Sequence, residues 1–378
     1  MAITRRHFSI ATAAGLVAGT AAAVPAPSSD WAALQIVPLT GVNGGVGWHL
    51  SVGAQVAFAQ ANAGGPPHGR SLRLVTLDEE PGHIADQVRE HLRSDNPVAL
   101  LAWHGRRSVG ELARARLLEE TGLPMLGVMS GSLTAPGFGS PWLFATRGSV
   151  ADEIDQVFRH AETTFARRIA LLTSNDEDGQ EITAIARMRA PLLGVTLANV
   201  QQHLAETAEV ADAVAAIVRV PHDAVVLATN TAAVAYFSKL YAAAGGRGRV
   251  IVLSSAEATH LSSVVGPDTA RGLLVSQLVP HPRDPKLRLM REFGTAYKRF
   301  GPAGIAPTLA MTESYIAARV LIDALQRGGA SATGPAVQQA LAGAPKAFEL
   351  AGLPLSLKRQ GPQYHNMSVI GPSGQLLF

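Results

Sequence analysis

The sequence predicts an α/β protein with two similar lobes, each built on a doubly wound parallel sheet. Short apolar runs alternate along the chain with amphipathic segments of helix length. This alternation is typical of right-handed βαβ units. It occurs in two series of four strands, which favours two lobes over one large sheet. With 378 residues, the chain is long enough to form both cores.

The expected strands of the first series are "LQIVPL", "LRLVTL", "VALLAW" and "PMLGVM", at 34–39, 72–77, 98–103 and 124–129. Segments such as "ADQVREHLRS" and "GELARARLLEETG" place apolar residues three and four positions apart, as amphipathic helices do. The strands of the second series are "RIALLT", "VTLANV", "AVVLAT" and "VIVLS", at 168–173, 195–200, 224–229 and 250–254. After "RGLLVSQLVP", helices are expected at 284–300 and 308–327, and short strand-like pieces close the chain.

Composition excludes several classes of protein. Hydrophobic residues make up 47% of the chain and charged residues 16%, as in folded globular proteins. The formal charge is +3, and no basic stretch is interleaved with aromatic residues, which argues against a nucleic-acid partner. The absence of cysteine excludes disulfides, thiolate metal sites and a cysteine nucleophile.

No cofactor is expected. The stretch "TGVNGGVGWHL" follows the first strand and looks like a dinucleotide-binding loop, but Leu50 stands where the third glycine should be. The Gly-rich loop then either makes a tight turn or offers the following helix N-terminus to an anionic group. The twelve histidines are scattered without metal-like spacing.

The N-terminus has the features of a bacterial twin-arginine export signal over residues 1–23. Arg5 and Arg6 precede a mildly apolar Ala/Gly-rich region, and "AAA" before Val24 allows cleavage after Ala23. The alternative is an unstructured N-terminus with a chance arginine pair. The apolar region is short and poor in Leu and Ile, which argues against a membrane anchor. We therefore expect an exported, periplasmic protein.

Several segments carry a family resemblance. These are "IVPLTG", "GRSLRLVTLDEE", "TRGSVADEI", "RIALLTSNDEDGQE", "LVSQLVPHPRDPKLRLMREFGTAYKRFG" and "MTESYIAARVLIDALQRGG". In order, from residue 34 to 378, they resemble the periplasmic leucine/isoleucine/valine-type solute-binding proteins of ABC transporters, which are type I periplasmic binding proteins. The resemblance implies two lobes joined by three crossover segments, with a ligand cleft between them. The implied boundaries are 28–147 and 273–345 for lobe 1, and 148–272 and 346–378 for lobe 2.

In this family, the loops after the third and fourth strands offer hydroxyl and backbone N–H groups to the ligand's carboxylate. Here these loops read "HGRRS" and "MSGSLTAP", and the arginine pair departs from the family pattern. A guanidinium group binds a carboxylate with two parallel hydrogen bonds, so we expect Arg106 or Arg107 to hold the solute's carboxylate. The alternative is that one or both point to solvent or cap the next helix. The candidate ligand-binding residues of this lobe are Asn43, His104, Arg106, Arg107, Ser108, Ser130 and Ser132.

The second lobe also departs from the family. Asp178 precedes Gly179 where the family usually has an aromatic residue, and Glu257 stands roughly where the family places an acid for an ammonium group. Either acid could instead be solvated surface. A basic wall facing an acidic wall suits a zwitterion or a polar acid better than a bare aliphatic side chain. The candidates of this lobe are Asp178, Asn230, Thr231 and Glu257.

The resemblance implies a monomeric receptor that binds a small amino acid or polar carboxylate and docks on ABC permease subunits. The alternative is a ligand sensor of the same fold that acts on a regulatory partner without transport. Neighbouring genes for a permease and an ATPase would distinguish the two. A secreted hydrolase would need a nucleophile–base pair, which the motifs do not show. We therefore expect no enzymatic activity.

Overall fold

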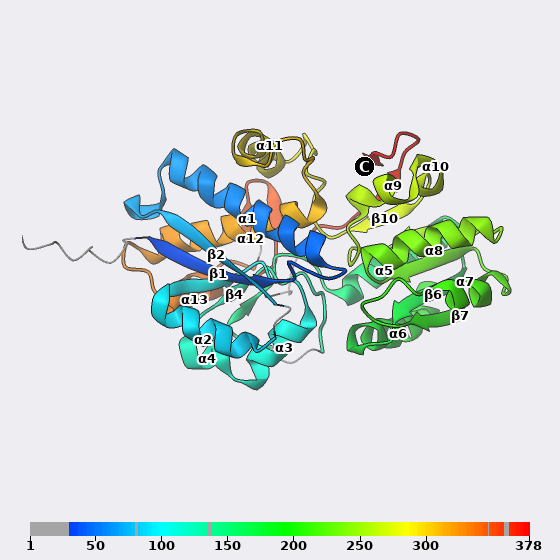
Figure 1. Cartoon of the computed structure of the whole chain (residues 1–378), viewed down its shortest axis with the longest axis horizontal. Coiled ribbons are helices and arrows are strands. Elements are labelled where there is room, and N and C mark those ends of the chain that lie inside the picture. Colours follow the sequence, from blue (N-terminus) through cyan, green and yellow to red (C-terminus); the bar gives the residue numbers. More distant parts are fainter. Residues whose placement is uncertain (1–29, 80–81, 135–137, 347, 359–362) are drawn as a thin grey trace, which may run out of the picture.

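Two α/β lobes lie side by side in the structure, which is a computed structural model (Figure 1). It describes residues 30–79, 82–134, 138–346, 348–358 and 363–378. The expected export signal and its cleavage site lie outside these residues. Each lobe has its own sheet between two layers of helices, so the predicted fold class is confirmed.

The first lobe has a five-stranded parallel sheet in the order β2-β1-β3-β4-β5. Its strands are β1 (Trp31–Val37), β2 (Leu72–Asp78), β3 (Pro97–Leu101), β4 (Met125–Leu126) and β5 (Leu143–Phe144). Its helices are α1 (Gly44–Gly64), α2 (Ile84–Ser94), α3 (Arg106–Arg114), α4 (Leu117–Thr121), α11 (Arg288–Phe300), α12 (Leu309–Gly328) and α13 (Gly334–Ala342). Alternate strand residues face opposite layers: Ala33 and Leu101 join the core under α1 and α12, whereas Leu34 and Leu100 join the core under α2 to α4. This two-sided burial explains the unbroken apolar runs in the sequence.

The second lobe has a seven-stranded sheet in the order β14-β13-β10-β9-β8-β6-β7, with only β13 and β14 antiparallel to their neighbours. Its strands are β6 (Arg168–Ser174), β7 (Thr196–His203), β8 (Ala224–Ala228), β9 (Arg249–Val252), β10 (Leu274–Gln277), β13 (Asn366–Ile370) and β14 (Leu376–Leu377). Its helices are α5 (Val150–Thr163), α6 (Glu177–Arg189), α7 (Ala211–Val218), α8 (Thr231–Ala243), α9 (Leu261–Val265) and α10 (Pro267–Ala270). Ile169 and Val226 face the core under α5 and α6, and Ala170 and Val225 face the opposite side.

Several sequence-based boundaries need correction. The helix expected over "GELARARLLEETG" is divided into α3 and α4, because Arg116 adopts a left-handed backbone conformation with φ of 51°. Helix α13 was not predicted. The expected lobe boundary at 272/273 places β10 in lobe 1, but β10 pairs with β9 and β13 in the second sheet. The hairpin β11–β12 (Phe348–Leu350 and Leu353–Leu355) was expected in lobe 2, yet it adjoins α11 through a hydrogen bond from Leu289 N to Ala351 O.

Three crossover segments join the lobes: 145–149, 278–287, and the stretch between β12 and β13, of which 356–358 and 363–365 are described. The first and third are tied together, because Ala145 N donates to Leu357 O at 2.9 Å. Among the described helices, none is long and apolar enough to span a bilayer.

A glycine near the start of a helix brings backbone close to the preceding strand in each lobe. A Cβ atom at Gly47 of α1 would lie 1.7 Å from the Pro38 carbonyl oxygen, and one at Gly179 of α6 would lie 1.8 Å from that of Ser174. Both positions therefore exclude any side chain. This close approach favours the tight-turn interpretation of "TGVNGGVGWHL".

Candidate functional site

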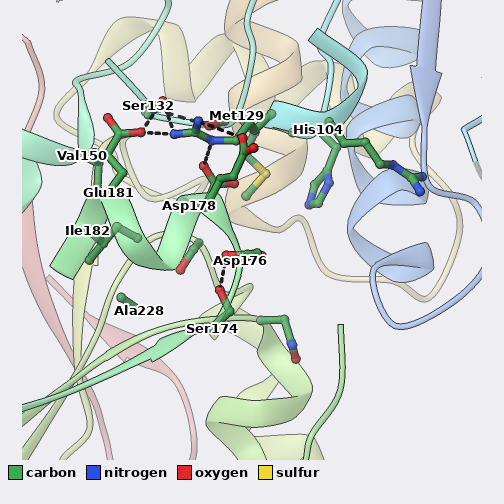
Figure 2. A pocket seen from close by; sticks show the side chains of 18 of the residues that line it. His104, Met129, Ser132, Val150, Ser174, Asp176, Asp178, Glu181, Ile182 and Ala228 are labelled. Atoms are coloured by element: carbon green, nitrogen blue, oxygen red, sulfur yellow. Dashed lines mark hydrogen bonds and ion pairs between the residues drawn. The ribbon is translucent and has the colours of Figure 1, made fainter. Parts of the chain in front are cut away.

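A cavity of about 520 Å³ lies between the lobes, at the carboxyl ends of strands from both sheets. Loops after β1, β3 and β4 line it from lobe 1, and loops after β6, β8 and β9 line it from lobe 2 (Figure 2). The lining contains apolar side chains such as Met129, Val150 and Ile182 among many polar groups. A cavity of this size and composition is typical of a small-molecule binding site.

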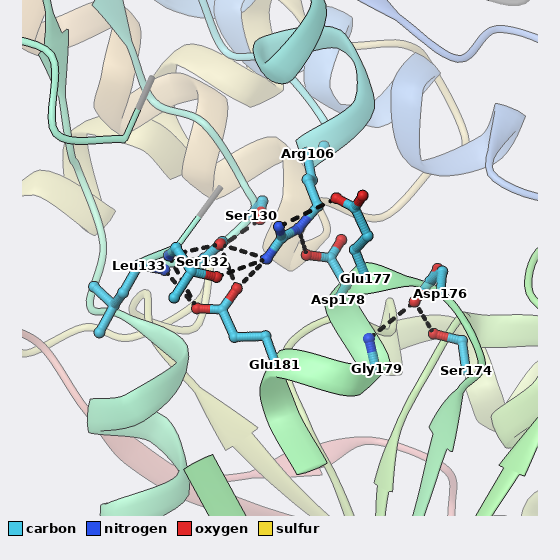
Figure 3. A network of polar contacts seen from close by, with 12 residues as sticks. Arg106, Ser130, Ser132, Leu133, Ser174, Asp176, Glu177, Asp178, Gly179 and Glu181 are labelled. Carbon is cyan, nitrogen blue, oxygen red and sulfur yellow. Dashed lines mark hydrogen bonds and ion pairs between the residues drawn. The ribbon is translucent and has the colours of Figure 1, made fainter. Parts of the chain in front are cut away.

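Arg106 reaches across this cavity from lobe 1 to lobe 2 (Figure 3). It is the first residue of α3, and its side chain is only 12% exposed. The guanidinium donates from Nε to Asp178 at 2.5 Å and from Nη1 to Glu177 at 3.5 Å, and it also pairs with Glu181. Its Nη2 atom donates to Ser132 at 2.8 Å in its own lobe. Arg106 therefore bridges the two lobes.

Glu181 of α6 inserts its carboxylate into the loop after β4 of the opposite lobe. The backbone N–H groups of Leu133 and Thr134 donate to its Oε1 atom at 2.8 and 3.2 Å. The Ser132 hydroxyl and Arg106 donate to its Oε2 atom. We call Arg106, Ser132 and the Leu133 and Thr134 N–H groups the carboxylate cradle. Four donors around one carboxylate are a strong arrangement for an anion.

The pKa values of two acidic residues on α6, Glu181 and Asp178, shift in opposite directions. Burial alone would raise the pKa of Glu181, but the cradle's hydrogen bonds and the positive charge of Arg106 together hold that pKa below its usual value. Partial burial, together with the neighbouring Asp176 and Glu181, raises the pKa of Asp178, and Arg106 opposes this shift without cancelling it. Asp176 caps the start of α6 by accepting from Gly179 N at 2.9 Å. The environment of Glu181 therefore stabilises its anionic form, whereas that of Asp178 does not.

The other lobe 1 side chains lie beside the bridge. Arg107 lines the cavity, but its side chain is 53% exposed, and its Nη2 atom lies 3.8 Å from a carboxylate oxygen of Glu79. Burial, with a contribution from the charge of Arg107, lowers the pKa of His104 to about 4. His104 is therefore uncharged at neutral pH and can act as a neutral hydrogen-bonding group in the lining.

A buried polar cluster lies where the lobes meet, and three of its residues, Arg147, Glu153 and Ser254, line the cavity. Arg147 of the first crossover donates to Glu313 of α12 at 2.7 Å and to the Ser254 hydroxyl. Ser254, which follows β9, donates from its N–H and its hydroxyl to Glu153 of α5 at 2.7 and 2.8 Å. All four side chains are nearly inaccessible to solvent. We call Arg147, Glu153, Ser254 and Glu313 the hinge cluster, because it joins both lobes through a crossover segment.

Burial raises the pKa of Glu313 to about 7, and the positive charge of Arg147 only partly opposes this shift.

Among the described residues, no group of three or more His, Asp or Glu side chains is arranged to hold a metal ion.

Most of the candidates chosen from the sequence line the cavity, and three do not. Those that line it are Asn43, His104, Arg106, Arg107, Ser130, Ser132, Asp178 and Asn230. Asn230 also caps α8 by accepting from Ala233 N. Arg106 was expected to hold the solute's carboxylate, and in this structure its guanidinium contacts lobe 2 carboxylates of the protein itself.

Ser108, Thr231 and Glu257 do not line the cavity, which corrects their expected position. Ser108 is fully buried within α3, where its hydroxyl donates to Gly105 O. Thr231 accepts from Glu257 N at 2.9 Å. Glu257 is 4% exposed and accepts from Ala310 N of α12 at 2.9 Å, so its carboxylate stabilises contact between the lobes.

Sequence reasoning missed Glu181 and the hinge cluster. Glu181 stands three residues after Asp178, a spacing that places both side chains on one face of a helix. This spacing is the feature of the sequence from which Glu181 could have been identified as a candidate. Arg147 and Glu313 are far apart in sequence, and no local pattern indicates their pairing.

Solved structures with a similar fold cover nearly the whole chain. A substrate-binding periplasmic protein from Ralstonia solanacearum is 28% identical, with a TM-score of 0.85 over 92% of this chain and 99% of that chain. A possible leucine/isoleucine/valine-binding protein from Rhodopirellula baltica is 20% identical, with a TM-score of 0.82 over 94% and 98% of the two chains. A branched-chain amino acid ABC transporter protein from Thermus thermophilus, with bound valine, is 15% identical, with a TM-score of 0.79 over 92% and 94%.

A search of curated proteins finds no match. The family model described as "Periplasmic binding protein" matches residues 35–370, which is most of the chain. The two lobes, the crossover segments and the cavity between them agree with this match. The resemblance stated from the sequence is thereby confirmed, and the chain belongs to the periplasmic binding protein family.

Proposed function

We propose that this protein is an extracytoplasmic receptor of an ABC importer and binds a small amino acid or polar carboxylate between its lobes. The observation that carries the proposal is the cavity itself. Both lobes line it, and the carboxylate cradle of lobe 1 faces the acids of α6. A solute held by both walls would favour the closed arrangement of the lobes, because it gains contacts that the open arrangement lacks.

The charges of the lining favour a solute that carries an ammonium group as well as a carboxylate. Seven carboxylates and four arginines line the cavity, so its balance is negative although the whole chain is slightly positive. No Phe, Tyr or Trp is among the described residues of the lining. Valine is bound to the Thermus thermophilus protein. The present lining offers less apolar contact for such a side chain than an aromatic wall would, which favours a more polar solute.

A thermal-shift screen of the mature protein over amino acids and carboxylates tests this proposal. A solute that binds only the folded protein raises the melting temperature by an amount set by its concentration relative to Kd. We expect stabilisation by at least one polar amino acid or carboxylate, and weaker or no stabilisation by its amide or ester. If no zwitterion or carboxylate stabilises the protein, whereas other solute classes do, the proposed ligand class is wrong.

We infer that the protein reaches the periplasm through the twin-arginine pathway and docks there on ABC permease subunits. Replacing Arg5 and Arg6 by Lys should leave full-length precursor in the cytoplasm, because that pathway reads the arginine pair. Cell fractionation and the mature N-terminus, expected near Val24, provide the measurement. Mature protein that still reaches the periplasm through the general secretory route would contradict the assignment.

A further inference from the structure

We propose that Glu181 is a built-in placeholder for the solute's carboxylate: it occupies the carboxylate cradle, holds the lobes together in part of the solute-free population, and is displaced by the solute. The inference rests on the proposed function, because it concerns the regulation of the same cavity. It goes further in assigning one of the protein's own side chains as a competitor of the solute.

The first argument is the chemistry of the cradle. Two consecutive backbone N–H groups, a hydroxyl and a guanidinium converge on one carboxylate, at 2.8 Å for Leu133 N and 3.2 Å for Thr134 N. None of these donors belongs to the helix that carries Glu181 (Figure 3). Convergent N–H groups with an arginine form a general receptor for anionic groups. A free carboxylate would therefore satisfy the same four donors.

The second argument is the position of the cradle. Its side chains Arg106 and Ser132 line the cavity, and so does Glu181, whose own side chain is 6% exposed. A solute carboxylate in the cavity therefore lies within reach of the cradle and competes with Glu181 for it. Displacement would release a lobe 2 carboxylate, which could then pair with an ammonium group of the same solute.

The third argument is that the contact joins two lobes. Glu181 belongs to α6 of lobe 2, whereas the cradle belongs to the loop after β4 and to α3 of lobe 1. The favourable ionisation of Glu181 described above means that this clasp is an ion pair at neutral pH. Opening the cleft breaks it, so the clasp closes part of the solute-free population, and the remaining molecules stay open until solute binds.

Glu177 provides a matched control on the same helix. It also faces Arg106, but at 3.5 Å and with a side chain that is 74% exposed. In the described contacts it accepts from neither Leu133 nor Thr134. Removing its carboxylate changes the charge of α6 as much as removing that of Glu181, and it leaves the cradle filled.

The experiment measures the solute-free protein, prepared by unfolding and refolding, with sodium acetate as the probe. Glu181→Ala empties the cradle, and acetate can fill it. We expect Glu181→Ala to have a larger radius of gyration than wild type by small-angle scattering. We also expect 100 mM acetate to raise its melting temperature by about 2–4 °C over sodium chloride of equal ionic strength. Wild type and Glu177→Ala should respond to the two salts alike.

Glu181→Gln covers the case in which the alanine variant does not fold. The amide fills the cradle but lacks the negative charge, so we expect a larger radius than wild type and no selective response to acetate. An unchanged radius together with equal responses to acetate and chloride in the folded variants would overturn the placeholder. That result would leave solute binding by wild type intact. Failure of the solute screen with a positive acetate result would instead overturn the proposed ligand class.

Discussion

Replacing Arg106 by Ala is expected to weaken binding of the solute between thirtyfold and several thousandfold. Arg106 is 12% exposed, and it supplies the guanidinium of the carboxylate cradle. Removing one side of a buried charged hydrogen bond costs about 2–5 kcal/mol, because the other charge is left unpaired. This cost corresponds to the stated loss of affinity. Isothermal calorimetry with the solute from the screen measures it, after a check that the variant is folded.

Arg107→Ala is the matched control for this experiment. Arg107 is the next residue in the same loop, but it is 53% exposed and lies 3.8 Å from Glu79. An arginine at the rim of a site mainly affects the rate of association and its salt dependence. We expect its loss to change affinity much less than the loss of Arg106 does. If both variants bind within about a factor of three of wild type, neither arginine holds the solute.

Replacing Arg147 by Ala should lower the free energy of unfolding by about 3–5 kcal/mol. Arg147 is 4% exposed and contacts Glu313 and Ser254, while Glu153 lies on the far side of Ser254. Its removal leaves buried carboxylates without their cation, and burial of an unpaired charge is strongly unfavourable. Denaturant unfolding measures the loss. A change below about 1 kcal/mol would contradict the assigned role of the hinge cluster.

Glu313→Gln is the companion variant for Arg147→Ala. The pKa of Glu313 is raised to about 7 in the folded protein, so the folded protein binds this proton more tightly than the unfolded chain does. Its contribution to stability is therefore fully present below about pH 4.5 and is lost as the pH rises through 7. The glutamine variant should show a flatter dependence between pH 5 and 8. Combined with Arg147→Ala, it should recover part of the lost stability, since one unpaired carboxylate is gone.

The fold could be predicted largely from the sequence, because strands that are buried on both faces of a sheet appear as unbroken apolar runs. Strands such as β6 and β8 appear as unbroken apolar runs, and α12 ends at a glycine pair. The two-residue strands β4 and β5 are too short for such a signature, and β5 was missed. The lobe boundary near β10 was displaced because pairing partners far along the chain decide to which sheet a strand belongs.

The site was predictable in position but not in its pairings. The loops after β3 and β4 were expected to carry the carboxylate-binding groups, and Arg106 and Ser132 do meet there. Of the acids that pair with Arg106, Asp178 was a candidate from the sequence, whereas Glu181 was not foreseen. Glu257 was wrongly expected to line the cavity. Its carboxylate instead accepts a hydrogen bond from α12 of the other lobe. No local sequence pattern indicates which side chains will pair across the two lobes.

The two cavity variants are expected to change the Kd for the solute in opposite directions, which distinguishes the role of Arg106 from that of Glu181. Loss of Arg106 removes a group that binds the solute, whereas loss of Glu181 removes a competitor. We therefore expect Arg106→Ala to raise Kd and Glu181→Ala to lower it, if the carboxylate of the solute enters the cradle.

Small-angle scattering of the wild-type protein with and without the solute tests the central claim, which is that two lobes close on a small solute without changing it. The cavity lies between lobes that are joined only by crossover segments and interlobe contacts, so added solute contacts should favour the closed arrangement. We expect a smaller radius of gyration with solute than without, and recovery of the solute chemically intact from the same sample. An unchanged radius with saturating solute, or conversion of the solute by the pure protein, would contradict the account.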